Sequence, residues 1–414
     1  MSMYRRERYL KKMRAFYHDE GIIKVITGVR RCGKSCLMQT VREELLEQGV
    51  DSERIVYLDL DARRHRSIRT PDELEALIDA RVSEGGRTEG GRTYLFIDEI
   101  QNVKGFEELI NGYRTDGGFS IFITGSNSYL LSGELATKLT GRYLEFELFT
   151  LDFSEYLGMK RHLGKPVDAS LDAEFTNYIL EGGFPKAVEY DELADKRAYV
   201  QGVIQEIFEK DIRANKKIRH VSVFTAVRDY LINNFGATTS ISNLLGYFNQ
   251  VQGIPIKRET LNRYIEILTS AKILYRCPRF DMKSKRSLQG EEKYYLADLG
   301  FYFALNTDNR ISYGPVLENI VYLYARSQGY AVSVGRIGRL ECDFILRAGA
   351  LDYAYVQVAM TIADEEVENR EYRSLETIRD AYPRYVMTLD RLLQRRNGIH
   401  HVNVVDFLAG EERF

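Results

Sequence analysis

The residues with the clearest chemistry lie between positions 28 and 35, which read GVRRCGKS. Two glycines with four residues between them, followed by Lys34 and Ser35, let a loop turn its backbone N–H groups toward phosphate oxygens. The run GIIKVITG (21–28) predicts a buried strand before the loop, and Lys34 to Gln48 predicts an amphipathic helix after it. We expect this phosphate-binding loop to hold a nucleotide through Gly28, Arg31, Cys32, Gly33, Lys34, Ser35 and Cys36.

A second group, YLFIDEIQ (94–101), places two carboxylates at the end of an apolar run. The carboxyl ends of parallel strands form the ligand-binding edge of an open α/β sheet. Ser35 and Asp98 are therefore predicted to bind Mg²⁺, and Lys34 to reach the β- and γ-phosphates of ATP. Glu99 is predicted to polarise the attacking water, so Lys34 and Glu99 are the main catalytic candidates.

Two further segments carry polar residues that could take part in hydrolysis. FITGSNS (122–128) ends a predicted strand, and Asn127, like Thr124 or Ser126, could contact the γ-phosphate or the water; a polar turn is the alternative. Arg142 in TGRY precedes the next strand and could stabilise transition-state charge on the ATP of a neighbouring subunit. A solvated or ion-paired arginine explains the same residue equally well.

The elements that would position these residues alternate between strands and helices. Apolar runs that predict strands are followed by helical spacing, for example after Pro71. This alternation predicts an α/β fold, a parallel sheet with helices on both faces, that ends near residue 150. The predicted strands are 21–28, 54–61, 93–98, 119–124 and 143–149.

Composition narrows the class of protein. Lys plus Arg (58) and Asp plus Glu (60) leave a net charge of −2, which excludes a strongly basic nucleic-acid coat protein. The sequence has no apolar run as long as a membrane span, and its first residues do not resemble a signal peptide. Four scattered cysteines predict neither a disulfide framework nor a zinc site, so we expect a cytoplasmic protein without a membrane partner.

With these motifs in hand, the sequence resembles the AAA+ superfamily, and within it a group of bacterial and archaeal ATPases with a C-terminal domain of unknown function. The resemblance implies a P-loop NTPase αβα sandwich with sheet order 5-1-4-3-2, ATP and Mg²⁺ as ligands, and homo-oligomers that share sites. It implies the roles given above for Asp98, Glu99 and Arg142. It also implies an ATPase domain over 1–215 whose residues 151–215 form a helical lid. The matching stretches are GVRRCGKS, YLFIDEIQ, ITGSNS, LTGRYLEFELFTLDFSEY, EGGFPKAV, KYYLADLGF, LENIVY and ECDF.

The middle segment, 216–300, resembles a winged-helix domain. Its helices are expected over 240–248 and 257–271, followed by a basic turn over 276–286. Basic residues beside such a fold could contact DNA phosphates, and a protein-interaction or spacer module with a solvated face is the alternative. The basic residues concerned are Arg213, Lys216, Lys217, Arg219, Lys257, Arg258, Arg263, Arg279, Lys283, Lys285 and Arg286.

The last segment, 301–414, resembles a mixed α/β domain with a restriction-endonuclease-like fold. Glu318, Glu341 and Asp343 could bind a metal, but Gln357 and Ala359 stand where an active member carries Glu and Lys. We therefore expect a degenerate nuclease fold.

The main functional hypothesis is Mg²⁺-dependent ATP binding and hydrolysis coupled to a conformational change, with nucleic acid as a candidate partner. The alternatives are a slow ATP-dependent switch that controls an interaction, and an ATP-regulated metal-dependent nuclease. A side hypothesis concerns Cys32. Next to Lys34 and at a helix N-terminus, an accessible thiol would be reactive, and its alkylation would block nucleotide binding; a small residue that merely fits the loop is the alternative.

Overall fold

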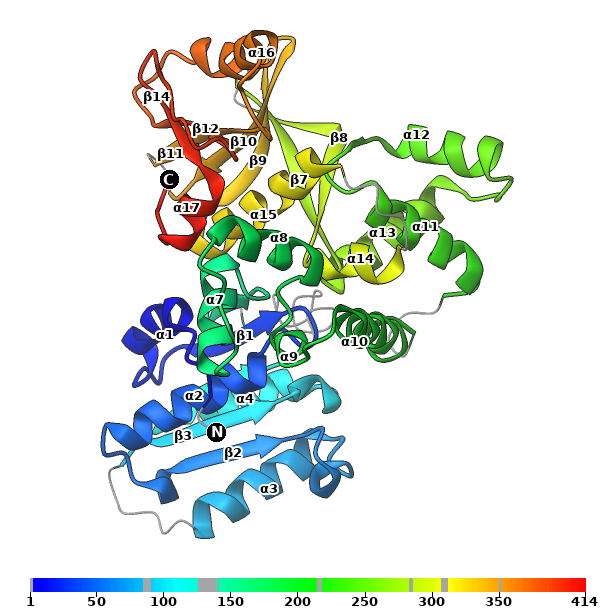
Figure 1. The fold of residues 1–414 in the computed structure, drawn as a ribbon. Helices are drawn as coiled ribbons and strands as arrows, with labels where there is room; N and C mark the ends of the chain where they lie inside the picture. The colour runs from blue at the N-terminus through cyan, green and yellow to red at the C-terminus, as the bar shows by residue number, and fades with distance from the viewer. Residues whose placement is uncertain are drawn as a thin grey trace. The chain divides into compact units, whose positions relative to one another are not determined.

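The computed structural model describes residues 3–84, 91–125, 139, 141–213, 218–282, 286–306, 312–349 and 352–414. The chain forms two compact units, Met1–Leu148 and Phe149–Phe414. Each unit has a sheet of its own, and each is described separately below (Figure 1).

The first unit is built on a five-stranded parallel sheet in the order β2-β3-β4-β1-β5. Read from the other edge this is 5-1-4-3-2, so the predicted order is confirmed. The strand that leads into the phosphate-binding loop lies inside the sheet, next to the edge strand β5, and one strand separates it from the strand that carries Asp98. The strands are β1 (Ile23–Gly28), β2 (Ile55–Asp59), β3 (Thr93–Asp98), β4 (Phe119–Thr124) and β5 (Tyr143–Leu148).

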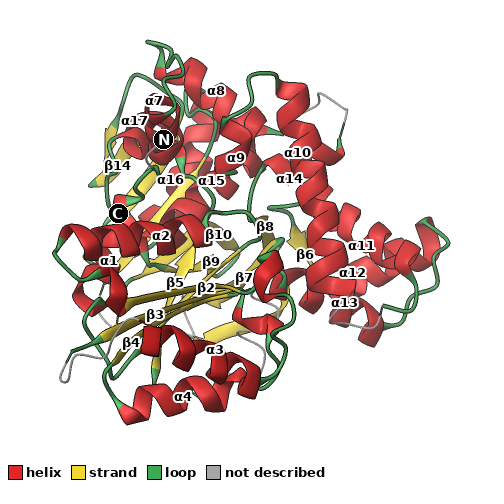
Figure 2. Cartoon of the chain, turned by 90° about the horizontal axis from the view of Figure 1, so that it is seen from below, coloured by secondary structure: helices red, strands yellow, loops and turns green. Residues whose placement is uncertain are grey.

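Helices cover both faces of this sheet (Figure 2). Leu74 of α3 and Phe106 of α4 pack into one apolar core with alternate residues of the strands, such as Val25 and Ile97. The other face turns Lys24 and Asp98 toward the side of α1 and α2. The period-2 alternation of side chains along each strand separates these two sets. The helices are α1 (Glu7–Met13), α2 (Lys34–Glu47), α3 (Pro71–Glu84) and α4 (Phe106–Asp116).

The second unit combines a helical part with a nine-stranded mixed sheet in the order β13-β14-β12-β11-β10-β9-β7-β8-β6. The helices are α7 (Phe153–His162), α8 (Leu171–Glu181), α9 (Pro185–Val188), α10 (Leu193–Glu206), α11 (Val221–Asn233), α12 (Ile241–Gly246), α13 (Arg258–Ser270), α14 (Gly300–Leu305), α15 (Tyr313–Gln328), α16 (Glu365–Glu376) and α17 (Val404–Ala409). The strands are β6 (Thr238–Thr239), β7 (Leu274–Asp281), β8 (Arg286–Leu296), β9 (Ala331–Ile337), β10 (Leu340–Arg347), β11 (Tyr353–Val358), β12 (Arg384–Thr388), β13 (Arg395–Arg396) and β14 (Ile399–Asn403).

The middle segment has the two helices that its apolar spacing predicts. Ser240 caps α12 by accepting from the N–H of Asn243 at 3.1 Å, and α13 buries Leu261, Ile265 and Leu268 along one side. The hairpin β7–β8 that follows pairs through β7 with β9, so the middle and last segments share one sheet. The winged-helix and nuclease-like assignments and the boundaries 1–215, 216–300 and 301–414 stay predictions. By contacts alone, residues 151–215 group with the second unit.

Two motifs of vague chemistry, EGGFPK and LADLG, meet around the buried carboxylate of Asp298. The carboxylate accepts from the N–H of Gly183 at 2.8 Å and from the N–H of Gly300 at 2.7 Å. A Cβ on Gly182 would lie 2.1 Å from Asp298 Oδ1, and one on Gly183 would lie 2.2 Å from the carbonyl oxygen of Leu151. These glycines are therefore required by close packing.

Candidate functional site

The phosphate-binding loop needs its glycines for two different reasons. Gly28 ends β1 beside Leu148 of β5, and a Cβ there would lie 2.2 Å from the Leu148 carbonyl oxygen. Gly33 has φ of 108° directly before α2, a conformation that side chains with a Cβ rarely adopt. Arg31 also has positive φ, 68°. The loop is thus curled tightly between the end of β1 and the first turn of α2, as expected for a phosphate cradle.

Lys34 is 7% exposed, and its ammonium is turned back onto the loop. Nζ donates to the carbonyl oxygen of Gly28 at 3.2 Å and to that of Val29 at 3.3 Å. Arg6, a buried residue just before α1, donates to the carbonyl oxygen of Cys32 at 3.3 Å. Two cations therefore satisfy carbonyl oxygens of the loop.

Asp98 lies at the carboxyl end of β3 and is 4% exposed. Its carboxylate is hydrogen-bonded by the hydroxyls of Ser35 and Thr124, and Tyr57 Oη lies 3.4 Å from Oδ2. Burial raises the pKa of Asp98, while the two hydroxyls act in the opposite direction. The sequence pair Ser35 and Asp98, 63 positions apart, is therefore brought together.

Glu99 follows Asp98 in a left-handed backbone conformation, with φ of 57° and ψ of 46°. Its N–H donates to Thr124 Oγ1 at 3.1 Å, so one threonine hydroxyl links both acidic residues. Its carboxylate accepts from the side-chain amide of Gln101. A non-glycine residue in this region of φ and ψ is strained and is found where the surroundings enforce it, which is typical of functional sites.

Arg142 lies at the amino-terminal end of β5, whereas the loop follows the carboxyl end of the neighbouring strand β1. Its carbonyl oxygen accepts from the N–H of Ile23 at the start of β1, and its side chain is exposed. Since Gly28 pairs with Leu148 at the other end, roughly 17 Å of strand separates Arg142 from the loop of its own chain. Asn127 and Ser126, the other candidates, lie outside the described residues.

The prediction of a reactive Cys32 thiol is wrong. Cys32 is completely buried, and its Sγ lies 3.4 Å from the carbonyl oxygen of Leu148. Burial raises the pKa of Cys32, and this effect outweighs the nearby Lys34. Cys36, in the first turn of α2, is the exposed thiol of the loop region. Whether the backbone of Cys32 contacts phosphate stays a prediction.

A second group of charged residues, the Lys293 cluster, is buried in the second unit. Lys293 Nζ on β8 lies 3.0 Å from Glu318 Oε2, 3.2 Å from Glu341 Oε1 and 3.8 Å from Asp343 Oδ1. Burial lowers the pKa of Lys293, but the three carboxylates outweigh it and raise the pKa overall. The sequence reading found these carboxylates without a lysine and missed Lys293, which comes close to them only in the folded chain.

Gln357 stands where the sequence lacks a metal-binding carboxylate, and its side chain is part of this polar network. Its Nε2 donates to Glu371 Oε2 at 2.8 Å, and the N–H of Val358 donates to Asp343 Oδ2 at 2.9 Å. Ala359 is buried next to it. Throughout the described ranges, no three His, Cys, Asp or Glu side chains are grouped so that they could hold a metal ion.

The basic turn expected at 276–286 is largely neutralised in the part that is described. Arg276 pairs with Glu292 at 3.0 Å, and Arg279 pairs with both Glu291 and Glu341. Arg279 is therefore held by carboxylates of the sheet. The side chains of Lys283, Lys285 and Arg286, and residues Lys216 and Lys217, lie outside the described part of the chain.

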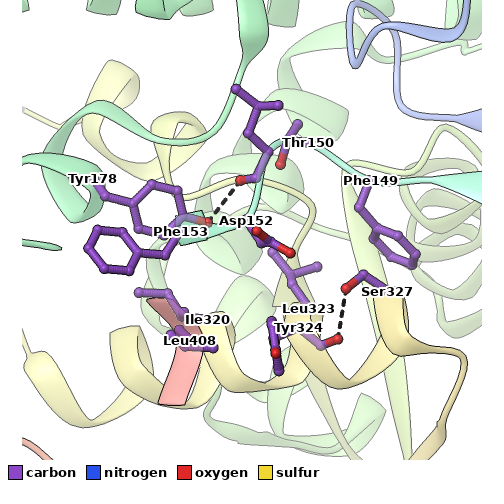
Figure 3. A pocket seen from close by; sticks show the side chains of 11 residues that line it. Phe149, Thr150, Asp152, Phe153, Tyr178, Ile320, Leu323, Tyr324, Ser327 and Leu408 are labelled. Carbon is purple, nitrogen blue, oxygen red and sulfur yellow. Dashed lines mark hydrogen bonds between the residues drawn. The ribbon is translucent and has the colours of Figure 1, made fainter. Parts of the chain in front are cut away.

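A small cavity in the second unit is not a ligand site. It has a volume of about 10 Å³ and lies between the segment 149–153, α8, α15 and α17 (Figure 3). Around it, Tyr178 donates to the carbonyl oxygen of Leu151 at 3.0 Å, and Ser327 donates to that of Tyr324 at 2.8 Å. This volume is at the threshold for one water molecule.

Among the helices that the structure describes, none has the length and apolar character of a membrane span.

Comparisons with known proteins agree with the geometry of the first unit. A family model described as an AAA domain matches residues 20–157, and a model for a domain of unknown function matches residues 172–311. The Walker-type ATPase of Pyrococcus abyssi has a similar fold, with a TM-score of 0.51 and 16% identity over 73% of this chain and 96% of that one.

Two relatives are similar over most of their length. An uncharacterised protein of Haemophilus influenzae is 33% identical over 98% of this chain and 99% of its own. An uncharacterised protein of Methanocaldococcus jannaschii is 32% identical over 84% of this chain and 78% of its own. The chain therefore belongs to the family of AAA-domain proteins that includes these two relatives.

Proposed function

We propose that this protein binds and hydrolyses ATP with Mg²⁺ and couples hydrolysis to a conformational change. The observation that carries the proposal is the meeting of Ser35 and Asp98 directly beside the phosphate-binding loop. A hydroxyl at the start of the loop helix and a buried carboxylate at the end of a nearby strand are the protein ligands that a nucleotide-bound Mg²⁺ requires.

The donor set fits the metal. Asp98 is a buried carboxylate without a cationic partner among the described residues, so a cation would offset the cost of its burial. Ser35 and Asp98 would hold Mg²⁺, which when bound neutralises charge on the phosphates.

The roles of the chain's own residues follow from their positions. Backbone N–H groups from Gly28 to Ser35 cradle the phosphates, and Lys34 exchanges the carbonyls of Gly28 and Val29 for phosphate oxygens. The carboxylate of Glu99 accepts a proton from the attacking water. Thr124 fixes the two acidic residues relative to each other through one hydroxyl.

Steady-state ATP turnover tests this proposal. We expect Lys34→Ala to weaken nucleotide binding, and Glu99→Gln to bind nucleotide normally while kcat falls by about 10²-fold or more. An unchanged kcat in Glu99→Gln would remove Glu99 from the role of base. Unchanged nucleotide affinity in Lys34→Ala would remove the loop from the account.

We further propose that Arg142 acts on the ATP of a neighbouring subunit in a homo-oligomer. Its side chain is exposed and lies at the end of the strands far from the loop, which supports a role between subunits over one within its own site. Mixing Lys34→Ala with Arg142→Ala tests this. If the arginine acts in trans, two inactive variants regain part of the activity when mixed, because intact loops then meet intact arginines. No regain, with mixed oligomers demonstrated, would contradict it.

A second candidate, a slow ATP-dependent switch, is supported by the contacts of Lys34 and Glu99. Both side chains are engaged by the protein itself, so binding must first exchange these contacts. Turnover below about one per minute with retained nucleotide would favour the switch over a motor.

Measuring the same turnover with and without DNA at two salt concentrations tests nucleic acid as a partner.

A further inference from the structure

We propose that Gln101 is a catalytic residue that orients the attacking water together with Glu99. This inference rests on the proposed ATP hydrolysis. Gln101 lies two positions after Glu99 in the short 3-10 turn Ile100–Asn102, and its Nε2 donates to Glu99 Oε2. The other end of the same amide, Oε1, is buried and accepts no hydrogen bond from any residue that the structure describes.

This orphaned acceptor is costly, which is why it indicates a ligand. A buried polar atom left without a partner costs about 1–3 kcal/mol, and native proteins retain such atoms rarely. The neighbouring residue of the turn shows the ordinary solution: Asn102 Nδ2 donates to the carbonyl oxygen of Leu60 at 3.2 Å. Gln101 instead directs one end of its amide at the candidate base and leaves the other available.

The backbone of the turn holds this pair in place. Glu99 has a left-handed conformation, its N–H is bound by Thr124, and its carbonyl oxygen accepts from the N–H of Asn102 at 3.1 Å. These contacts fix the start of the turn, so the carboxylate of Glu99 and the amide of Gln101 stay within hydrogen-bond distance. The strained backbone is the means by which two side chains from one turn meet.

The chemistry needs both acceptors. The water oxygen forms a bond to the γ-phosphorus, the bond from that phosphorus to the β–γ bridging oxygen breaks, and ADP leaves. One water proton passes to the carboxylate of Glu99. The other hydrogen stays on the new phosphate oxygen and is oriented by donating to Gln101 Oε1. An amide is too weak a base to take the proton, so Gln101 contributes orientation, as a glutamine does in other nucleotide hydrolases.

The test uses the full chain and compares kcat with nucleotide affinity. We expect Gln101→Leu, which fills the space without polar atoms, to lower kcat about 10- to 100-fold while the Kd for ATP stays within about twofold. Gln101→Glu keeps the size but cannot donate to Glu99, and should also lose activity. Asn102→Ala is the matched control from the same turn and should keep kcat within about twofold.

A double variant separates catalysis from folding. If Gln101 and Glu99 orient one water, Glu99→Gln/Gln101→Leu loses no more activity than Glu99→Gln alone. Wild-type kcat in Gln101→Leu, or a double variant whose loss is the product of the single losses, overturns the role of Gln101 and leaves the ATPase intact. Absence of turnover in the wild type instead overturns the proposed function, and this inference with it.

Discussion

The hydroxyl of Thr124 at the end of β4 donates a hydrogen bond to the carboxylate of Asp98 at the end of β3. The same oxygen accepts from the N–H of Glu99 at 3.1 Å. Because β3 and β4 are adjacent parallel strands, this single side chain fixes the candidate metal ligand and the candidate base to one neighbour. A change at Thr124 should therefore be felt at both.

We predict that Thr124→Val lowers the free energy of unfolding by about 1–3 kcal/mol, because it leaves the buried Asp98 with one donor fewer. It should also weaken Mg²⁺-dependent nucleotide binding more than Mg²⁺-independent binding. Urea unfolding and nucleotide titrations with and without Mg²⁺ measure the two effects. Thr124→Ser retains the hydroxyl and is the control. Equal stability of the valine variant and the wild type would show that the contact is not maintained.

The accessibility of the loop thiols is a second prediction. Cys36 is exposed and Cys32 is fully buried with a raised pKa, so iodoacetamide should label Cys36 in the native protein and both residues only after denaturation. Mass spectrometry of tryptic peptides distinguishes the two. Rapid native labelling of Cys32 would mean that the loop opens. If Cys32 stays buried as expected, Cys36→Ser should abolish labelling of the loop region in the native protein.

Lys24 predicts a dependence of stability on pH. It is fully buried on β1, its Nζ donates to the carbonyl oxygen of Asp19 and to Ser120 Oγ, and burial lowers its pKa to about 7. The unfolded chain then binds more protons than the native one from pH 7 to about 10, so stability rises with pH through that window. We expect the wild type to gain about 2 kcal/mol relative to Lys24→Met between pH 7 and pH 9. A difference in the free energy of unfolding between the two proteins that is the same at pH 7 and pH 9, measured by urea unfolding, would contradict this prediction.

The sequence predicts the first unit well because its signals are local. The strand, loop and helix around Gly28 and Lys34 are contiguous, and so are the apolar run and carboxylates that end at Asp98 and Glu99. The 5-1-4-3-2 order follows from the resemblance rather than from any spacing. The structure adds that the hydroxyl of Ser35, at the start of α2, reaches the carboxylate of Asp98 at the end of β3.

The contacts that sequence reasoning missed depend on side-chain direction or on distant pairing. Gln101 is adjacent to the motif, but only the left-handed turn at Glu99 directs its amide at the carboxylate. Lys293 meets Asp343 and Glu318 because β8 and β10 belong to one sheet and α15, which carries Glu318, packs against both strands, which no local pattern reveals. The sequence leaves Cys32 open between an accessible, reactive thiol and a small residue that fits the loop, and its burial against β5 supports the second.

Packing at the buried Asp298 yields a matched pair of glycine substitutions. Gly183→Ala would place a Cβ 2.2 Å from the carbonyl oxygen of Leu151, so the backbone must shift. We expect a loss of at least about 1–3 kcal/mol in the free energy of unfolding. Gly202 on α10 has nothing within 4 Å of its Cβ position, and Gly202→Ala should stabilise the protein by up to about 1 kcal/mol. Equal effects of the two variants in thermal unfolding would show that the chain around Asp298 has room for a methyl group at Gly183.

The Lys293 cluster should behave as a buried ion group in which one ammonium lies close to three carboxylates, one of which, Glu341, also pairs with Arg279. Removing one partner of a buried ion pair leaves uncompensated charge, so Lys293→Met should cost about 3–5 kcal/mol at pH 7. The penalty should shrink toward pH 5, because burial raises the pKa of Asp343 well above its ordinary value and this carboxylate can then take up a proton. Adding Glu318→Gln to Lys293→Met removes one of the negative charges that the loss of Lys293 leaves uncompensated, and should restore part of the stability. A penalty below about 1 kcal/mol, or one that does not change with pH, would mean that water already screens the cluster.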